Sequence, residues 1–215
     1  DSLNRISMVT RSLLLVSGAH KILVDTGNGD KWAEKYRRMY NIDMTRYSIE
    51  SSLQKYGFTP DDITDVFCTH LHFDHIGGNT RMDGEKVVPT FSNATYWVSQ
   101  DNWQLANHPS QKDQGSFLEW DWIVLAENNM LNIVNGDEPF LPGIDLYFTH
   151  GHTKGLMHPL IRDDQATLFY CADLVPMAAH IPVPWVMAYD IHPALTVQEK
   201  EELLPRMVKE NWILF

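Results

Sequence analysis

The sequence predicts a layered α/β fold, because short apolar strands and amphipathic helices are mixed along its whole length. The chain has 215 residues, of which 44% are hydrophobic and 21% charged. A chain of this size can bury a substantial core in one domain, residues 1–215. The sequence contains no internal repeat and no linker. Two packed halves would therefore be parts of one domain rather than separately encoded domains.

The N-terminal third predicts a hairpin, two helices and a third strand. Apolar residues on both sides of a turn at Gly18 are typical of a hairpin. Apolar side chains at helical spacing after Ser48, with Gly57 beyond them, are typical of a capped helix. The expected elements are strands at 12–17 and 21–25, helices at 31–40 and 48–56, a capped turn at 59–62 and a strand at 65–69.

The rest of the chain predicts further strands, an ordered proline-rich loop and a helix. Four prolines between residues 176 and 193 argue against a regular element there. Glutamates near a positive helix end, with Thr196 as the cap, favour a helix after the loop. The expected elements are strands at 131–134, 145–149 and 167–170, the loop at 176–193, a helix at 198–209 and a last strand from 212.

Two segments carry aromatic side chains whose role the sequence leaves open. Residues 91–125 interleave aromatic and polar side chains, which suits either a substrate entrance or ordinary core packing. In the proline-rich loop, His180 and Tyr189 lie beside Trp185 and Met187. That mixture suits an acyl chain next to a polar head group, and ordinary loop packing explains it equally well.

Charge and composition exclude several function classes. The chain has 17 basic and 28 acidic residues, a formal charge of −11, and no Lys/Arg block at either end, so a nucleic-acid backbone would be repelled. We therefore expect neither a nucleic-acid partner nor, in the absence of a long apolar run, a membrane span. Cys68 and Cys171 cannot form a disulfide framework and are expected to be small buried residues.

The densest group of metal-binding side chains lies at residues 69–75. It contains His70, His72, Asp74 and His75 directly after an apolar strand. Imidazole nitrogens and carboxylate oxygens are the ligands that zinc and similar divalent ions prefer. On an extended segment, His70, His72 and Asp74 point to one side, because side chains repeat with period two. His75 points elsewhere, so one loop can supply two ligand sets.

The spacing H-x-H-x-D-H resembles the first motif of the metallo-β-lactamase superfamily. Further segments resemble that family's other motifs in the family's order: Leu23–Gly27, Gly77–Asn79, Gly151–Thr153 and Ala172–Asp173. The resemblance covers roughly residues 13 to 176. It implies a four-layer αβ/βα sandwich in which two mixed β-sheets are flanked by helices.

The resemblance also implies a site with two divalent metal ions. It assigns one ion to His70, His72 and His152, and the other to Asp74 and His75, with Asp173 bridging. The second ion needs one more histidine, which we expect a few residues beyond Phe215. Zinc is the expected metal, and manganese, iron or cobalt are alternatives.

A paired site of this kind suits hydrolysis. Two ions about 3.5–4 Å apart can hold a hydroxide between them. They also polarise the carbonyl or phosphoryl oxygen of the substrate that the hydroxide attacks. Asp74 would orient the hydroxide and accept a proton. Asp25 is a candidate partner for the outer nitrogen of a ligand histidine, although a turn-forming Asp before Thr26 explains it equally well.

The motifs most resemble the bacterial branch of N-acyl-homoserine lactonases and related quorum-quenching hydrolases, which also includes methyl-parathion-type esterases. Asp173 stands where zinc β-lactamases commonly have Cys, which disfavours antibiotic hydrolysis. Several lactonases have Tyr where this chain has Pro176, so either Tyr189 or another donor replaces it or the substrate differs. A small lactone or ester is therefore the expected partner.

Other functions remain as alternatives on the same site. Phosphotriester or aryl-ester hydrolysis comes next, followed by a glyoxalase II-like thioesterase. A binding protein without turnover and a ribonuclease are further alternatives; the intact ligand set disfavours the first and the negative charge the second. The sequence does not decide between a monomer and a homodimer.

The first and last residues of the sequence resemble the ends of a fragment. The chain begins at Asp1 without Met and ends on an apolar run, residues 212–215, which is typical of a strand cut midway. We therefore expect truncation at both ends. A cytoplasmic location is expected, with a lost N-terminal signal peptide as the alternative.

Overall fold

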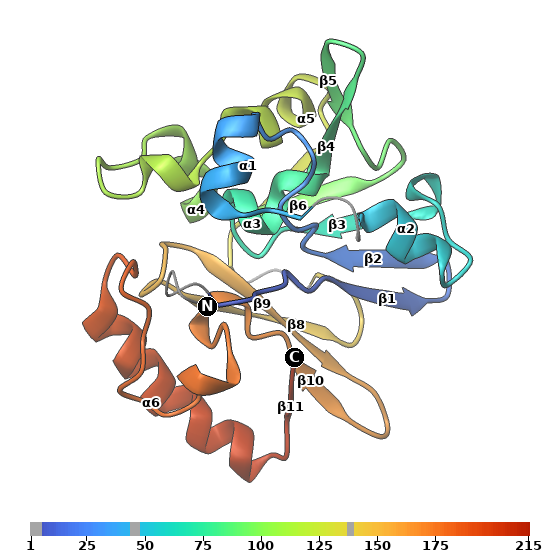
Figure 1. Ribbon diagram of the computed structural model, residues 1–215. Coiled ribbons are helices and arrows are strands. Elements are labelled where there is room, and N and C mark those ends of the chain that lie inside the picture. Colours follow the sequence, from blue (N-terminus) through green and yellow to red (C-terminus); the bar gives the residue numbers. More distant parts are fainter. Residues whose placement is uncertain (1–5, 44–47, 137–139) are drawn as a thin grey trace. The chain divides into compact units, whose positions relative to one another are not determined.

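A computed structural model describes residues 6–43, 48–136 and 140–215. It has an α/β architecture with two mixed β-sheets, a separate two-stranded hairpin and helices between the strands (Figure 1). The predicted fold class is thereby confirmed. The chain divides into two compact units, and each combines three separate segments of the sequence.

The first unit contains most of a five-stranded sheet. Its strand order is β1 (Leu13–Ser17), β2 (His20–Val24), β3 (Asp65–Phe67), β6 (Thr95–Ser99) and β7 (Leu131–Val134). Strands β1 and β2 are antiparallel, whereas β2, β3 and β6 run parallel. All residues of β3 are buried, as is usual for a central parallel strand.

Several helices and a hairpin accompany this sheet in the first unit. They are α1 (Glu34–Tyr40), α2 (Ile49–Gln54), α3 (Phe73–Ile76), α5 (Ile123–Glu127), and the hairpin of β4 (Thr80–Asp83) and β5 (Lys86–Pro89). Helix α2 begins at Ser48 with a capping box to Ser51, so the predicted cap is confirmed. The predicted hairpin across Gly18 is also confirmed, with Leu13 opposite Val24.

The second unit contains a four-stranded sheet and the longest helix among the described residues. The strand order is β11 (Ile213–Leu214), β10 (Thr167–Phe169), β9 (Leu156–Arg162) and β8 (Ile144–Thr149), and the helices are α4 (Gln100–Asn107) and α6 (Pro193–Lys209). Met207 of α6 belongs to the same buried cluster as Leu160 of β9 and Phe169 of β10. The apolar side of α6 thus covers this sheet (Figure 1).

Two predictions about the C-terminal part were wrong. Strand β9 was missing from the expected strands, yet it pairs with both β8 and β10. Helix α6 begins at Pro193 rather than near residue 198. Proline is favourable in the first helical turn, so the last proline of the loop opens the helix. Thr196 is therefore a buried residue inside the helix and not its cap.

The cysteines are confirmed as buried and free. Burial raises the pKa of the thiols of Cys68 and Cys171 to about 12, so neither forms a thiolate at neutral pH. Four aromatic residues of segment 91–125 lie in the core: Phe91, Tyr96, Phe117 and Trp122. Core packing explains these four. Within the described part of the chain, no helix has the length and apolar character needed to span a bilayer.

Candidate metal centre

The first histidine loop leaves strand β3 and turns into a helix within a few residues. The chain is extended at His72, with φ −71° and ψ 145°, and helix α3 begins at Phe73. The amides of His75 and Ile76 donate to the carbonyl of His72 at 3.0 and 3.1 Å. The expectation that Asp74 continues the extended side of His70 and His72 was therefore wrong, because Asp74 lies in the helix.

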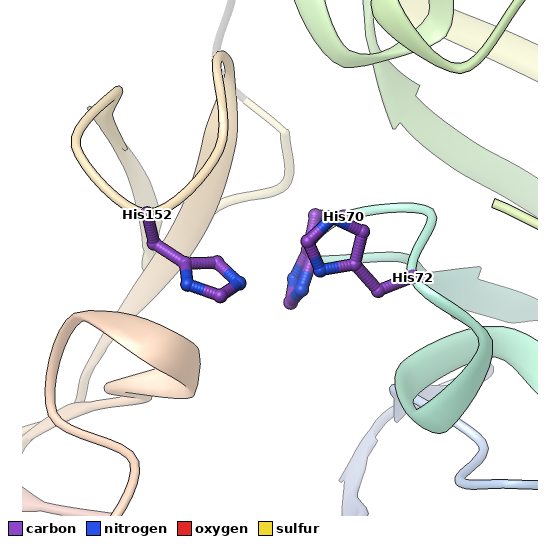
Figure 2. Close-up of side chains that lie close together, drawn as sticks. All are labelled: His70, His72 and His152. Atoms are coloured by element: carbon purple, nitrogen blue, oxygen red, sulfur yellow. The ribbon is translucent and has the colours of Figure 1, made fainter. Parts of the chain in front are cut away.

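His70 and His152 come together although they are distant in the sequence. Both rings are buried, and their centroids are 5.1 Å apart at an interplanar angle of 81°. Figure 2 shows the rings of His70, His72 and His152 turned toward one another. Nδ1 of His70 lies 3.1 Å from the hydroxyl of Thr69, a residue that the sequence did not single out.

Five of the six predicted ligands fall into two groups that share His70. One ligand atom from each of His70, His72 and His152 lies within 4.8 Å of the others, and the same holds for His70, His75 and Asp173. The first group is the set that the family resemblance assigned to one ion. The second group contains two of the residues that were assigned to the other ion.

Asp173 has its own connection to the first group. Its Oδ2 lies 3.2 Å from Nε2 of His152. Asp173 follows strand β10 in a short 3₁₀ turn, Ala172–Leu174, in which Ala172 has a left-handed φ of 41°. That conformation is costly for a residue with a Cβ, and such strain is most often retained at functional sites.

His75 is oriented by Asp25. Oδ2 of Asp25 lies 2.8 Å from Nδ1 of His75, and the Asp25 backbone is itself left-handed, with φ 55°. Asp25 thus lies at a turn and beside a ring nitrogen of His75, which are the two contexts that the sequence left open. Gly77 lets the two loops approach, since a Cβ there would lie 2.2 Å from the carbonyl oxygen of Asn28.

The three other predicted residues lie outside both groups. Asp74 is half-buried, and its Oδ2 is 3.9 Å from Nε2 of His75. Tyr189 is 57% exposed, and its ring meets that of His152 edge-on at a centroid distance of 6.1 Å. His180 lies in the short 3₁₀ helix Ala178–His180, where its carbonyl accepts a hydrogen bond from Lys200.

His158 is buried but serves the fold. Its Nε2 lies 2.8 Å from the hydroxyl of Thr149 and its Nδ1 lies 3.2 Å from the carbonyl of Tyr170, while its ring stacks on Phe169. Burial lowers the pKa of His158 to about 4, so the ring is neutral at physiological pH.

Sequence reasoning missed the residues that hold these loops. Oδ1 of Asp190 lies 2.9 Å from Nδ1 of His152. Asn102 of α4 accepts from the amide of Leu71 and donates to the carbonyl of Lys154, so it links the two histidine loops. None of these residues belongs to a sequence motif, and their partners are 31 to 52 residues away.

Helix α6 also supports the second histidine loop. Both oxygens of the Glu199 carboxyl group accept hydrogen bonds, from the amides of His150 and Gly151 at 2.5 and 3.1 Å. Burial raises the pKa of Glu199, and these two bonds lower it in part. Gly151 is needed here, because a Cβ at this position would lie 2.4 Å from the backbone nitrogen of Thr196.

The donor set fits a divalent transition metal. Imidazole nitrogens and a carboxylate oxygen are the protein ligands of zinc and its neighbours. Here the imidazoles of His70, His72 and His152 are buried close together, which is costly for polar rings unless their nitrogens have partners. The His and Asp residues are thus positioned to bind metal.

Comparison with known proteins points the same way. A family model described as the metallo-beta-lactamase superfamily matches residues 8–215. An N-acyl homoserine lactonase of Bacillus thuringiensis is 29% identical over 118 residues, which are 55% of this chain and 40% of that protein. The matched stretch is therefore less than half of the relative's length.

Two solved structures are similar over almost the whole chain. One is a probable metal-dependent hydrolase from Staphylococcus aureus, with a TM-score of 0.87 and 27% identity over 95% of this chain and 72% of that one. The other is an N-acyl homoserine lactone hydrolase with the product N-hexanoyl-L-homoserine bound at its catalytic metal centre. Its TM-score is 0.70, with 25% identity over 94% of this chain and 78% of that one.

Proposed function

Because the chain belongs to the metallo-β-lactamase superfamily, we propose that it is a metal-dependent hydrolase that opens small lactones, with N-acyl-homoserine lactones as the first substrate class. The observation that carries this proposal is the pair of ligand groups that share His70. The similarity to lactonases supports the choice of substrate.

The proposed site would hold two divalent ions, with zinc as the expected metal. His70, His72 and His152 would hold one, and Asp74 and His75 the other, with Asp173 between them. The contacts of Asp173 support this assignment, since it lies against His152 and also belongs to the group of His75. When bound, such ions lower the pKa of water and polarise the carbonyl oxygen of a substrate.

The chain's own residues would supply orientation and a proton acceptor. Asp25 holds the ring of His75 through Nδ1 and leaves Nε2 for the site. Asp74 is half-buried beside His75, where its carboxylate can orient an attacking water and accept its proton. The exposed Tyr189 beside His152 is the proposed donor to the substrate's carbonyl oxygen, in place of a Tyr at the position of Pro176.

Relative activities test the substrate class. The full-length protein supplied with zinc should hydrolyse N-hexanoyl-homoserine lactone, as measured by acid release in a pH-stat. We expect a larger kcat/KM for the lactone than for a neutral phosphotriester or an acyl thioester. The opposite ranking would keep the metal site and contradict the lactonase proposal.

A variant pair tests whether the shared histidine matters. His70→Ala should lower kcat/KM by at least about 100-fold, since metal affinity falls steeply when a ligand or its support is lost. His20→Ala is the matched control, because His20 is about half-exposed and bonds to Asp65. Equal losses in the two variants would point to general destabilisation and contradict a metal role for His70.

A further inference from the structure

We infer that Asp190 is a positioning residue for the candidate metal ligand His152. Its carboxylate holds the imidazole in the tautomer that carries the proton on Nδ1, which leaves Nε2 as the nitrogen that can bind metal. The inference rests on the metal site of the proposed function, but it does not depend on the substrate.

The geometry of the pair defines the tautomer. Oδ1 of Asp190 lies 2.9 Å from Nδ1 of His152, and the two residues are only 1% and 2% exposed. A carboxylate can only accept, so the ring N–H must be on Nδ1. Nε2 is then the ring nitrogen left to bind metal. It faces the other candidate ligands, because it lies 3.2 Å from Oδ2 of Asp173.

The surroundings hold Asp190 in place. The hydroxyl of Thr196 donates to its other oxygen, Oδ2, at 3.0 Å. Nζ of Lys112 donates to its main-chain carbonyl at 2.5 Å. The next amide, that of Ile191, donates to the carbonyl of His152 at 3.0 Å, so the two loops are also joined through their backbones. A carboxylate supported in this way restricts the ring of His152 to one orientation.

A second buried aspartate in the chain provides a comparison. Asp65 also bonds to a histidine ring, that of His20, at 3.1 Å, and it accepts from the hydroxyl of Thr64 and the indole of Trp97. His20 belongs to neither candidate ligand group. Asp65, like Asp190, is therefore a buried carboxylate bonded to a histidine ring and a threonine hydroxyl, but its histidine is not a candidate metal ligand.

Zinc affinity without substrate tests the inference. In Asp190→Asn the side chain keeps its shape, but its single oxygen can serve only one of the two donors, His152 or Thr196. We expect zinc to bind the metal-depleted protein about 10- to 100-fold more weakly, as measured by competition with a chromophoric chelator. Asp65→Asn should lower thermal stability and leave zinc affinity unchanged.

The tautomer itself is a second and independent readout. In the metal-free wild-type protein with ¹⁵N-labelled histidine, NMR should show the ring proton of His152 on Nδ1. In Asp190→Asn the signal of the Nδ1 proton should be lost, or a second signal from the tautomer protonated on Nε2 should accompany it. A wild-type His152 without a proton on Nδ1, or an Asp190→Asn protein that binds zinc as tightly as wild type, would overturn the inference. A wild-type protein that binds no zinc but shows the Nδ1 tautomer would contradict the proposed metal site and leave the positioning by Asp190 intact.

Discussion

At the scale of single residues, buried histidines in this chain serve two different purposes. His70 and His152 face each other and other ligand atoms, whereas His158 is enclosed by Thr149, Tyr170 and the ring of Phe169. The surroundings of His158 offer one acceptor and one hydroxyl, which suits a neutral ring. His158 should therefore affect stability rather than metal binding.

His158 predicts a specific pH dependence of stability. Its pKa is lowered by burial from 6.5 to about 4, so the unfolded chain binds more protons between these pH values. The stability contribution is complete above about pH 6.5 and is lost as the pH falls toward 4, by about 3 kcal/mol in total. Urea unfolding of the metal-free protein across this range should show the loss.

Variants separate this contribution from those of other groups. His158→Gln should be less stable than wild type at pH 8, but its stability should fall less between about pH 6.5 and 4. His108→Gln is the control, because His108 is exposed at the end of α4. A pH slope in His158→Gln as steep as that of wild type would refute the role given to His158.

At the scale of elements, helix α6 supports the loops that carry the site. Glu199 caps the amides of the second histidine loop, and Thr196 holds Asp190. Lys200 is fully buried, and its ammonium donates to the carbonyls of His180, Pro182 and Trp185. Lys200 of α6 is therefore bonded to three carbonyls of the proline-rich loop.

Lys200 gives a test of this support. Lys200→Met keeps the length of the side chain but leaves three carbonyls without their donor, which should lower the free energy of unfolding by about 2–4 kcal/mol. Lys209→Met, an exposed lysine at the end of the same helix, should change it by less than about 0.5 kcal/mol. Chemical denaturation measures both. Equal effects would show that the three hydrogen bonds do not hold the loop.

Local patterns in the sequence predicted those features that depend on residues close together in the sequence. The hairpin across Gly18 and the cap at Ser48 are of this kind. Of the residues expected as ligands at 70–75, His70, His72 and His75 belong to the two ligand groups. The contact of Asp190 with His152 spans 38 residues and follows only from the folded chain. Strand β9 was missed for a related reason, since His158 is polar in sequence but finds its partners in the folded sheet.

At the scale of the whole molecule, the charge of −11 bears on which substrates reach the site. A neutral lactone has little long-range electrostatic interaction with the charged protein. Its kcat/KM should therefore change less than about 2-fold between about 0.05 and 0.5 M salt. An anionic ester should be hydrolysed faster as salt screens the repulsion. Steady-state kinetics at both salt concentrations provide the comparison. Salt-sensitive binding of RNA by the protein would contradict our expectation that it has no nucleic-acid partner.

We propose that the two ligand groups sharing His70 form a metal site that opens lactones. The most direct test is a zinc titration of metal-depleted full-length protein, with N-hexanoyl-homoserine lactone hydrolysis followed in a pH-stat. We expect no hydrolysis above background without zinc and a rise to a plateau at two zinc ions per chain. Hydrolysis at the same rate with and without zinc, or none at any zinc concentration, would contradict the proposal.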